Sequence, residues 1–413
     1  MKTLNKKTFR HTAFAAFSAL VLSANVFGAA VPVYAAESSW NLQDNVIDFD
    51  EVGELVENYS MLAELQKSTT ENMTSSFDDV YAALQDNYQE AKDDFDDGIE
   101  ELTSLRDETT DSETRKQLNQ QISALRKQKK LALDQISAYW NENTAGGSGT
   151  NLAKTKQQIV SSIASGYYSA KQQMTYGYQS AIYTYKGLEL NQKLLNQQIA
   201  MYQASYEKVQ KQQASGAATA ADVQSALLNL NGAKINLEKI ENAMDTLKRT
   251  IGTGLGWNTT SYKNISFGAV PEYPLDFAAG RNLESDIQAA QQKNSQYGTA
   301  SRIKDEDFTT WDNREISIAA SEQEIRIGMT SLLESVKQKQ AEYTAAQTSA
   351  ELAKAKKERA DRMDAVGLVG RAEYDGLQLD YLNKANAVET ARMNYSQAVY
   401  DYHMAVEKGI ISE

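Results

Sequence analysis

The segment 214–230, with the sequence ASGAATAADVQSALLNL, decides the fold of this chain. It joins a turn of small residues around Gly216 to a stretch in which apolar residues recur at heptad spacing. A segment of the same design, 365–381 (AVGLVGRAEYDGLQLDY), places Gly367 151 residues after Gly216. Glycine readily adopts the left-handed conformation that ends a helix. We therefore expect one helix to end and another to begin at each of these glycines.

Apolar residues follow both glycines at the same offsets, which are multiples of seven or three more. In the first copy they are Val223, Ala226, Leu230, Leu237, Ile240, Met244, Leu247 and Ile251, and in the second Tyr374, Leu377, Tyr381, Val388, Ala391, Tyr395, Ala398 and Tyr402. This is the a/d pattern of a coiled coil, and its occurrence twice in one phase indicates an internal duplication. A long polar–apolar helix is predicted upstream of each glycine, over 151–213 and 314–364. Each half is therefore predicted to be a long antiparallel helical hairpin.

Proline positions divide the chain. Pro271 and Pro274 are the only prolines after the N-terminal region, and proline breaks the interior of a helix. Both lie in a segment rich in Gly, Asn and Tyr, 253–280, which we interpret as a linker between a first helical repeat, 36–252, and a second, 281–413. The predicted fold class is all-α, with two tandem repeats of the coiled-coil or α-barrel type.

The openings of the two halves also correspond in apolar spacing, over 49–58 and 283–294. Their final asparagines are 236 residues apart, whereas the two glycines are 151 apart, so the first half holds 85 additional residues. The stretch 69–150 accounts for them; it is acidic at first and basic later, with a break at 108–113. We expect an extra charged helical hairpin with complementary arms there.

The N-terminus has the features of a signal peptide over residues 1–35. Four basic residues precede an apolar core at 13–26, and small residues favour cleavage after Ala35. The alternative is an uncleaved membrane anchor, but the core is short for a span, which needs roughly 20 apolar residues. Export into the cell envelope is therefore predicted.

Composition restricts the chemistry. The net charge is −13, and cleavage would remove four of the 42 basic residues and none of the 55 acidic ones, leaving −17. Such a charge disfavours nucleic acid as a partner. There is no cysteine, and the mature chain has one histidine, His403, so no catalytic triad or zinc site of the usual kinds is available. We predict that the chain is not an enzyme and needs neither metal nor cofactor.

With these features the sequence resembles the TolC-like outer membrane efflux protein family. The resemblance lies in the tandem repeat, with a short opening helix, a long helix ending at a Gly, and an Asp-Val pair about six residues later, here Asp222-Val223; Glu373-Tyr374 matches the pair less strictly. It implies a homotrimer whose hairpins form a helical duct, docked to a membrane fusion or adaptor protein and an inner-membrane transporter. By position it implies tip and partner-docking residues Gly216, Ala217, Ala218, Thr219, Gly367, Leu368 and Val369, and a tip constriction formed by Asp222 and Glu373.

Each of these assignments has a plainer alternative. The glycines can simply end helices, and the two acids can be solvated first-turn residues that the helix dipole favours. A second acid that the family carries three residues after the first is replaced here by Ser225 and Gly376.

The family also inserts two membrane strands into each half. The corresponding segments, 141–150 and 299–314, are polar or charged and lack the alternating apolar pattern of such strands. The sequence therefore predicts no evident β-barrel. A structural or adhesive coiled-coil protein of the cell surface remains the alternative function, whereas a wall hydrolase lacks a supporting constellation.

Overall fold

The computed structural model describes residues 45–137, 152–302 and 311–411, and in these ranges the chain is almost wholly helical, as predicted. The predicted signal peptide and its cleavage site lie outside the described residues. So do the segment 141–150 and half of the segment 299–314, on which the prediction about membrane strands was based.

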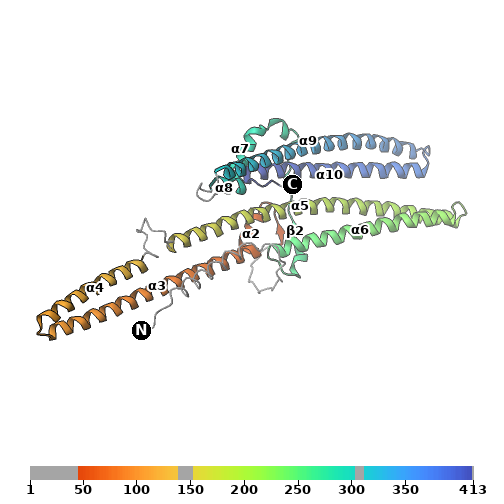
Figure 1. Ribbon diagram of the computed structural model, residues 1–413. Coiled ribbons are helices and arrows are strands. Elements are labelled where there is room, and N and C mark those ends of the chain that lie inside the picture. Colours follow the sequence, from red (N-terminus) through yellow and green to blue (C-terminus); the bar gives the residue numbers. More distant parts are fainter. Residues whose placement is uncertain (1–44, 138–151, 303–310, 412–413) are drawn as a thin grey trace. The chain divides into compact units, whose positions relative to one another are not determined.

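Three long antiparallel helix pairs build the molecule (Figure 1). The pairs are α3 (Met61–Glu108) with α4 (Ser112–Ser137), α5 (Leu152–Ala214) with α6 (Ala220–Gly254), and α9 (Trp311–Asp364) with α10 (Arg371–Lys408). Shorter helices open the halves: α2 (Val52–Tyr59) in the first, and α7 (Leu283–Lys293) and α8 (Ser295–Arg302) in the second. The prediction of long antiparallel hairpins is confirmed.

The heptad seams line the inside of the two repeat hairpins. All sixteen seam positions are buried or half-buried. The most buried seam residues are Leu230 and Ile251 on α6 and Tyr395 and Tyr402 on α10. In a contact between two helices each helix buries only one face, so the narrow apolar stripe formed by the seam residues is sufficient.

The segment 253–280, predicted as a linker, also contributes to the core. It contains the short helical turns η2 (Ser261–Asn264) and η3 (Phe277–Gly280) and the strand β2 (Ser266–Phe267). Strand β2 pairs in parallel with β1 (Val46–Ile47), so that Val46 lies opposite Ser266 and Ile47 opposite Phe267. Strands of two residues are too short for a sequence pattern, and the prediction missed them.

Two hydrophobic clusters lie at the ends of the hairpins opposite the turns. The first gathers α2, β1, β2, the middle of α5, the end of α6 and the end of α10. Within it, Phe49 meets the rings of Tyr183 and Tyr400 edge-on, with centroids 5.3 and 5.1 Å apart, a favourable geometry for aromatic pairs. The second cluster joins α7, α9 and α10.

The two repeats contact each other through α5 and α10. Polar side chains join these helices along their length: Tyr176 Oη donates to Asp401 at 3.0 Å, Tyr400 Oη donates to Gln179, and Gln198 Nε2 donates to Asn383 at 2.7 Å. Consequently α5 and α10 are inner helices, and α6 and α9 are the outer helices of the pair of hairpins.

Within the described ranges, no helix is both long enough and apolar enough to span a bilayer.

Candidate docking site at the hairpin tips

The turn after α5 ends the helix in a defined geometry. Gly216 has φ 78°, in the left-handed region. Its N–H donates to the carbonyl of Gln213 at 2.9 Å, and the N–H of Ala217 donates to Gln212 at 2.7 Å. This pair of bonds is the Schellman motif, which satisfies carbonyls that a helix end leaves without partners.

The turn after α9 repeats this geometry bond for bond. Gly367 has φ 73°. Its N–H donates to Asp364 at 3.0 Å, and the N–H of Leu368 donates to Met363 at 2.8 Å. The two glycines predicted from the sequence as tip turns therefore occupy the same position in the same motif, although the flanking residues differ.

The predicted constriction acid of the first half, Asp222, is engaged in its own helix. Thr219 is the N-cap of α6, and its hydroxyl accepts from the Asp222 N–H at 3.2 Å. In return the Asp222 carboxylate accepts from the Thr219 N–H at 2.8 Å and from the hydroxyl at 2.7 Å, which completes a capping box. The bonds from the Thr219 backbone and then from its hydroxyl hold the pKa of Asp222 below its usual range.

The second half lacks this cap. Gly370 is the N-cap of α10 and has no side chain to offer, and Glu373 is exposed. The two acids predicted to act alike are therefore held differently.

A carboxylate that the sequence analysis missed joins the arms of the second tip. Asp361 on α9 accepts from Tyr374 Oη at 3.0 Å and from Gln378 Nε2 at 2.7 Å, both on α10. Lys357, one turn earlier on α9, donates to it at 2.8 Å. These bonds, led by that of Lys357, lower the pKa of Asp361. In the sequence, Asp361 is recognisable only as an acidic residue about one and a half turns before Gly367. The heptad pattern does not distinguish it from the other acidic residues of α9.

The tips differ in surface chemistry. Most predicted docking residues are exposed, while Ala218 and Val369 are half-buried. The second tip presents large apolar side chains to solvent: Leu368 is 72% exposed and Val366, which the sequence analysis did not select, is 67% exposed. The first tip has only small residues at the corresponding places. An exposed apolar side chain at a turn is suited to binding a partner's apolar surface.

Outside the tips, His403, the one histidine in the part of the chain that the structure describes, packs among aromatic rings. His403 lies 5.4 Å from the ring of Tyr273 and 5.0 Å from that of Phe277, and burial lowers its pKa. Across the part of the chain that the structure describes, no group of three His, Cys, Asp or Glu residues is arranged to hold a metal ion.

Comparison with known proteins gives matches at the level of structure only. No family model matches the chain, and no curated protein matches it. In its helical fold the chain is similar to several solved membrane and outer membrane proteins. A membrane protein from Pseudomonas aeruginosa has 16% identity and a TM-score of 0.45, with 62% of this chain and 72% of that chain covered.

The CmeC outer membrane channel of Campylobacter jejuni has 15% identity and a TM-score of 0.43, with 62% and 67% covered. The outer membrane protein VceC of Vibrio cholerae has 13% identity and a TM-score of 0.41, with 62% and 74% covered.

Proposed function

We propose that the chain is a TolC-like component of an export or efflux assembly, acting as a helical duct or as a docking element for a membrane transporter. The observation that carries the proposal is the repeated tip: two hairpins of one duplicated design end in the same Schellman turn, with the flanking residues exposed. A duplicated hairpin with an exposed turn presents two related contact points at one end, and such an element acts by shape and docking without a covalent step.

The shafts of the hairpins support a closed assembly of several copies. Because α5 and α10 pair inside one chain, α6 and α9 are left as outer helices. Both carry exposed apolar residues: Leu228 and Ile235 on α6, and Ile316, Ile327 and Leu352 on α9. Their spacings of 7, 11 and 25 residues are close to whole numbers of helical turns, so each set forms one stripe. A contact of α6 with α9 of the next copy is heterologous, and such a contact closes into a ring when the rotation between copies divides a full turn.

We assign the apolar second tip to contact with a membrane fusion or adaptor protein, which links the duct to an inner-membrane transporter. Export by the predicted signal peptide would place the chain in the cell envelope.

The assembly is tested by the solution mass of residues 36–413, measured by light scattering without and with detergent. A trimer is expected, and changing Leu228 and Ile235 to Asp should give monomers because both are exposed on the proposed contact. A monomeric wild-type chain in both conditions would contradict the closed duct.

Docking is tested by export in cells that carry tip variants. With Val366→Asp and Leu368→Asp together, an exported dye should accumulate to the level of a deletion strain, because the charges oppose an apolar contact. Leu65→Asp is the matched control; Leu65 is also exposed but lies on α3, away from the tips. Normal export in the tip variant, with normal protein level, would exclude the tip as the docking site.

The second candidate function is a structural or adhesive protein of the cell surface. The charged α3/α4 hairpin favours it, because the hairpin lies outside the duplicated repeat on which the duct proposal is based. If the protein has this structural or adhesive role, deletion of its gene should leave export unchanged but alter the attachment of cells to a surface.

A further inference from the structure

The hairpin of α3 and α4 is poorly buried for its length. Across these two helices only Phe77 and Ile122 are buried. Gly98 allows close packing of the two helices, since a Cβ there would lie 3.3 Å from Leu125. The hairpin therefore stays together along one narrow line and leaves most of its surface uncovered.

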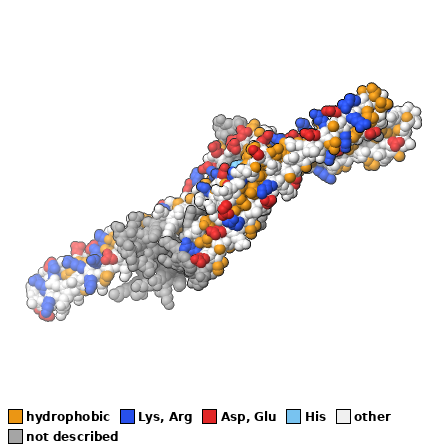
Figure 2. All heavy atoms as spheres, turned by 90° about the horizontal axis from the view of Figure 1, so that it is seen from above, with side chains coloured by type: hydrophobic (Ala, Val, Ile, Leu, Met, Phe, Trp, Pro, Cys, Tyr) orange, Lys and Arg blue, Asp and Glu red, His pale blue; other side chains and the backbone are white. Residues whose placement is uncertain are grey.

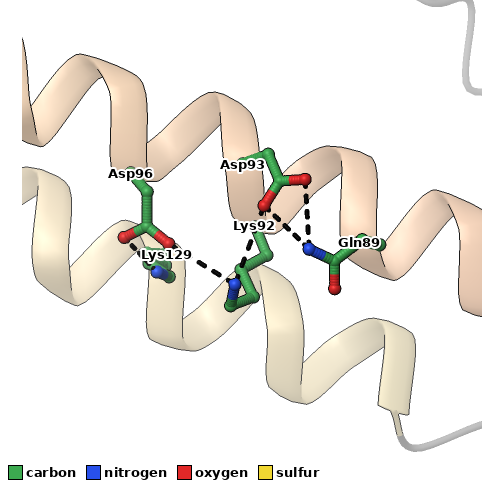
Figure 3. A network of polar contacts seen from close by, with 5 residues as sticks. All are labelled: Gln89, Lys92, Asp93, Asp96 and Lys129. Atoms are coloured by element: carbon green, nitrogen blue, oxygen red, sulfur yellow. Dashed lines mark hydrogen bonds and ion pairs between the residues drawn. The ribbon is translucent and has the colours of Figure 1, made fainter.

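The contact between the two helices neutralises little of their charge. Lys129 on α4 forms an ion pair with Asp96 on α3, and Lys92 lies 3.8 Å from the same carboxylate (Figure 3). Helix α3 carries 14 acidic and 3 basic residues, whereas α4 carries 6 basic and 2 acidic ones. Figure 2 shows charged side chains interspersed with uncharged ones at the end of this hairpin.

The remaining charges form two separate faces. The acidic face of α3 comprises Asp86, Glu90, Asp94, Asp97 and Glu101, all exposed and three or four residues apart. The basic face of α4 comprises Lys116, Arg126, Lys127 and Lys130, also exposed. Residues 95, 99 and 102 are half-buried and, by helical spacing, lie on the other side of α3 from the centre of the acidic face. One hairpin therefore cannot bring its own acidic and basic faces together.

The two faces lie at the same height along the hairpin. Because Asp96 and Lys129 meet, α3 residues near 94–98 are level with α4 residues near 127–131. Lys127 and Lys130 are thus level with Asp94 and Asp97 of the same chain. A second hairpin, placed alongside in parallel and in register, would set its basic face against this acidic face.

We propose that the α3/α4 hairpin is an interaction surface for a second copy of this chain, in which the basic face of one copy binds the acidic face of the next. Charge complementarity favours a second copy as the partner. The chain as a whole has a net charge of −13, so the basic face of α4 is unusual in it, and the acidic face of α3 on the same hairpin has the opposite charge. Each exposed ion pair is weak, but several together orient a contact and make it sensitive to salt. The contact is separate from the tips and from the stripes on α6 and α9.

The absence of cysteine makes a direct test possible. Ser104 lies one turn beyond Glu101 at the end of the acidic face of α3, and Ser123 lies beside the basic face of α4; both are exposed. Full-length mature chain with Ser104→Cys is mixed with chain carrying Ser123→Cys, so that a mixed disulfide can form only between copies. Gln121→Cys is the matched control: Gln121 is exposed at nearly the same level of α4 but on its other side.

The expected result is a 104–123 disulfide at low salt that exceeds the 104–121 product by roughly fivefold or more and falls when salt screens the charges. Arg126→Glu, Lys127→Glu and Lys130→Glu together should abolish this preference. Mixing that triple variant with Asp94→Lys, Asp97→Lys and Glu101→Lys should restore it, because the charges are then exchanged between copies. Circular dichroism verifies that the variants remain helical.

Equal yields of the 104–123 and 104–121 products would overturn the proposal, as would a preference that survives charge reversal. A binding assay with phosphatidylglycerol vesicles tests the rival occupant of the basic face, an anionic lipid surface. If they bind the wild-type chain through the basic face and no preferred disulfide forms, an anionic lipid surface replaces the second copy as the occupant. If the chain with unaltered faces forms a trimer but the 104–123 disulfide is not preferred over the 104–121 product, only this surface is refuted, and the proposed duct stands.

Discussion

At the scale of single residues, Asp401 is the carboxylate whose surroundings oppose its charge most clearly. It lies half-buried on α10 at the contact with α5, where it accepts a hydrogen bond from the hydroxyl of Tyr176. Burial raises the pKa of Asp401 to about 6, against a smaller lowering by that hydrogen bond. A carboxyl whose pKa is higher in the folded state destabilises the fold once it is charged.

Replacing Asp401 with Asn should stabilise the protein at neutral pH. The destabilisation by wild-type Asp401 begins above the unfolded pKa of 3.8 and is complete above about 6. Asn keeps an acceptor for Tyr176, so we expect a gain of about 1–2 kcal/mol at pH 7 and no gain at pH 3.5. Urea denaturation at both pH values measures this. A gain that is the same at both would mean that charge burial is not the cause.

Two glycines should respond oppositely to alanine. Gly256 has φ 101°, and a Cβ there would lie 2.8 Å from the carbonyl oxygen of Tyr59. Gly256→Ala should therefore cost about 1–3 kcal/mol. Gly187, inside α5, has open space around its Cβ position, so Gly187→Ala should add up to about 1 kcal/mol. Thermal unfolding of both variants provides the comparison, and destabilisation by Gly187→Ala would show an unrecognised contact on that face of α5.

At the scale of elements, the two tips make a matched pair for testing helix caps. Thr219→Ala removes the capping box of α6 and should cost about 1 kcal/mol, while Thr219→Ser should retain most of it. Gly370 has extended backbone angles that any residue can adopt, and Glu373 already stands three residues on. Gly370→Ser should therefore create a capping box and stabilise α10 by a few tenths of a kcal/mol.

Denaturant midpoints for the three variants measure both effects. An unchanged midpoint for Thr219→Ala would show that this end of α6 frays before the rest of the chain unfolds.

The sequence predicted these elements correctly where a residue type acts directly on the backbone conformation around it. Heptad spacing identified both long hairpins, and the glycines located both turns, because these signals act locally. The pairing of β1 with β2 and the bonds of Asp361 depend on residues brought together by the fold, so no local pattern contains them. The predicted linker was judged from its prolines and glycines, yet Trp257, Tyr262 and Phe267 bury their rings in the first cluster.

At the scale of the whole molecule, burial is concentrated at one end of the repeat hairpins. The aromatic and aliphatic clusters occupy the middle of α5, the end of α6 and the end of α10, and the tips have no such cluster among the described residues. Regions with few buried apolar contacts open at low free energy.

Hydrogen exchange should therefore show a gradient along each hairpin. Amides of residues 179–185 and 395–405 should be protected close to the global free energy of unfolding, and those of 212–219 and 363–370 should exchange orders of magnitude faster. Mass spectrometry of peptides covering these ranges measures the gradient. Uniform protection along the hairpins of the isolated chain would show that stability is not set by the two clusters.

The Schellman turns have a consequence for how such a chain can diversify. Each turn closes through backbone N–H and carbonyl groups and needs only one glycine with positive φ. Of the side chains beside these glycines, that of Ser215 adds a bond to the Gln212 carbonyl at 2.9 Å, but the two closing bonds come from the backbone, so these side chains can be exchanged without rebuilding the helices. A short cassette of residues at each tip can thus be grafted from one protein to another, and binding preference can change by inheritance or by engineering while the shaft is left alone.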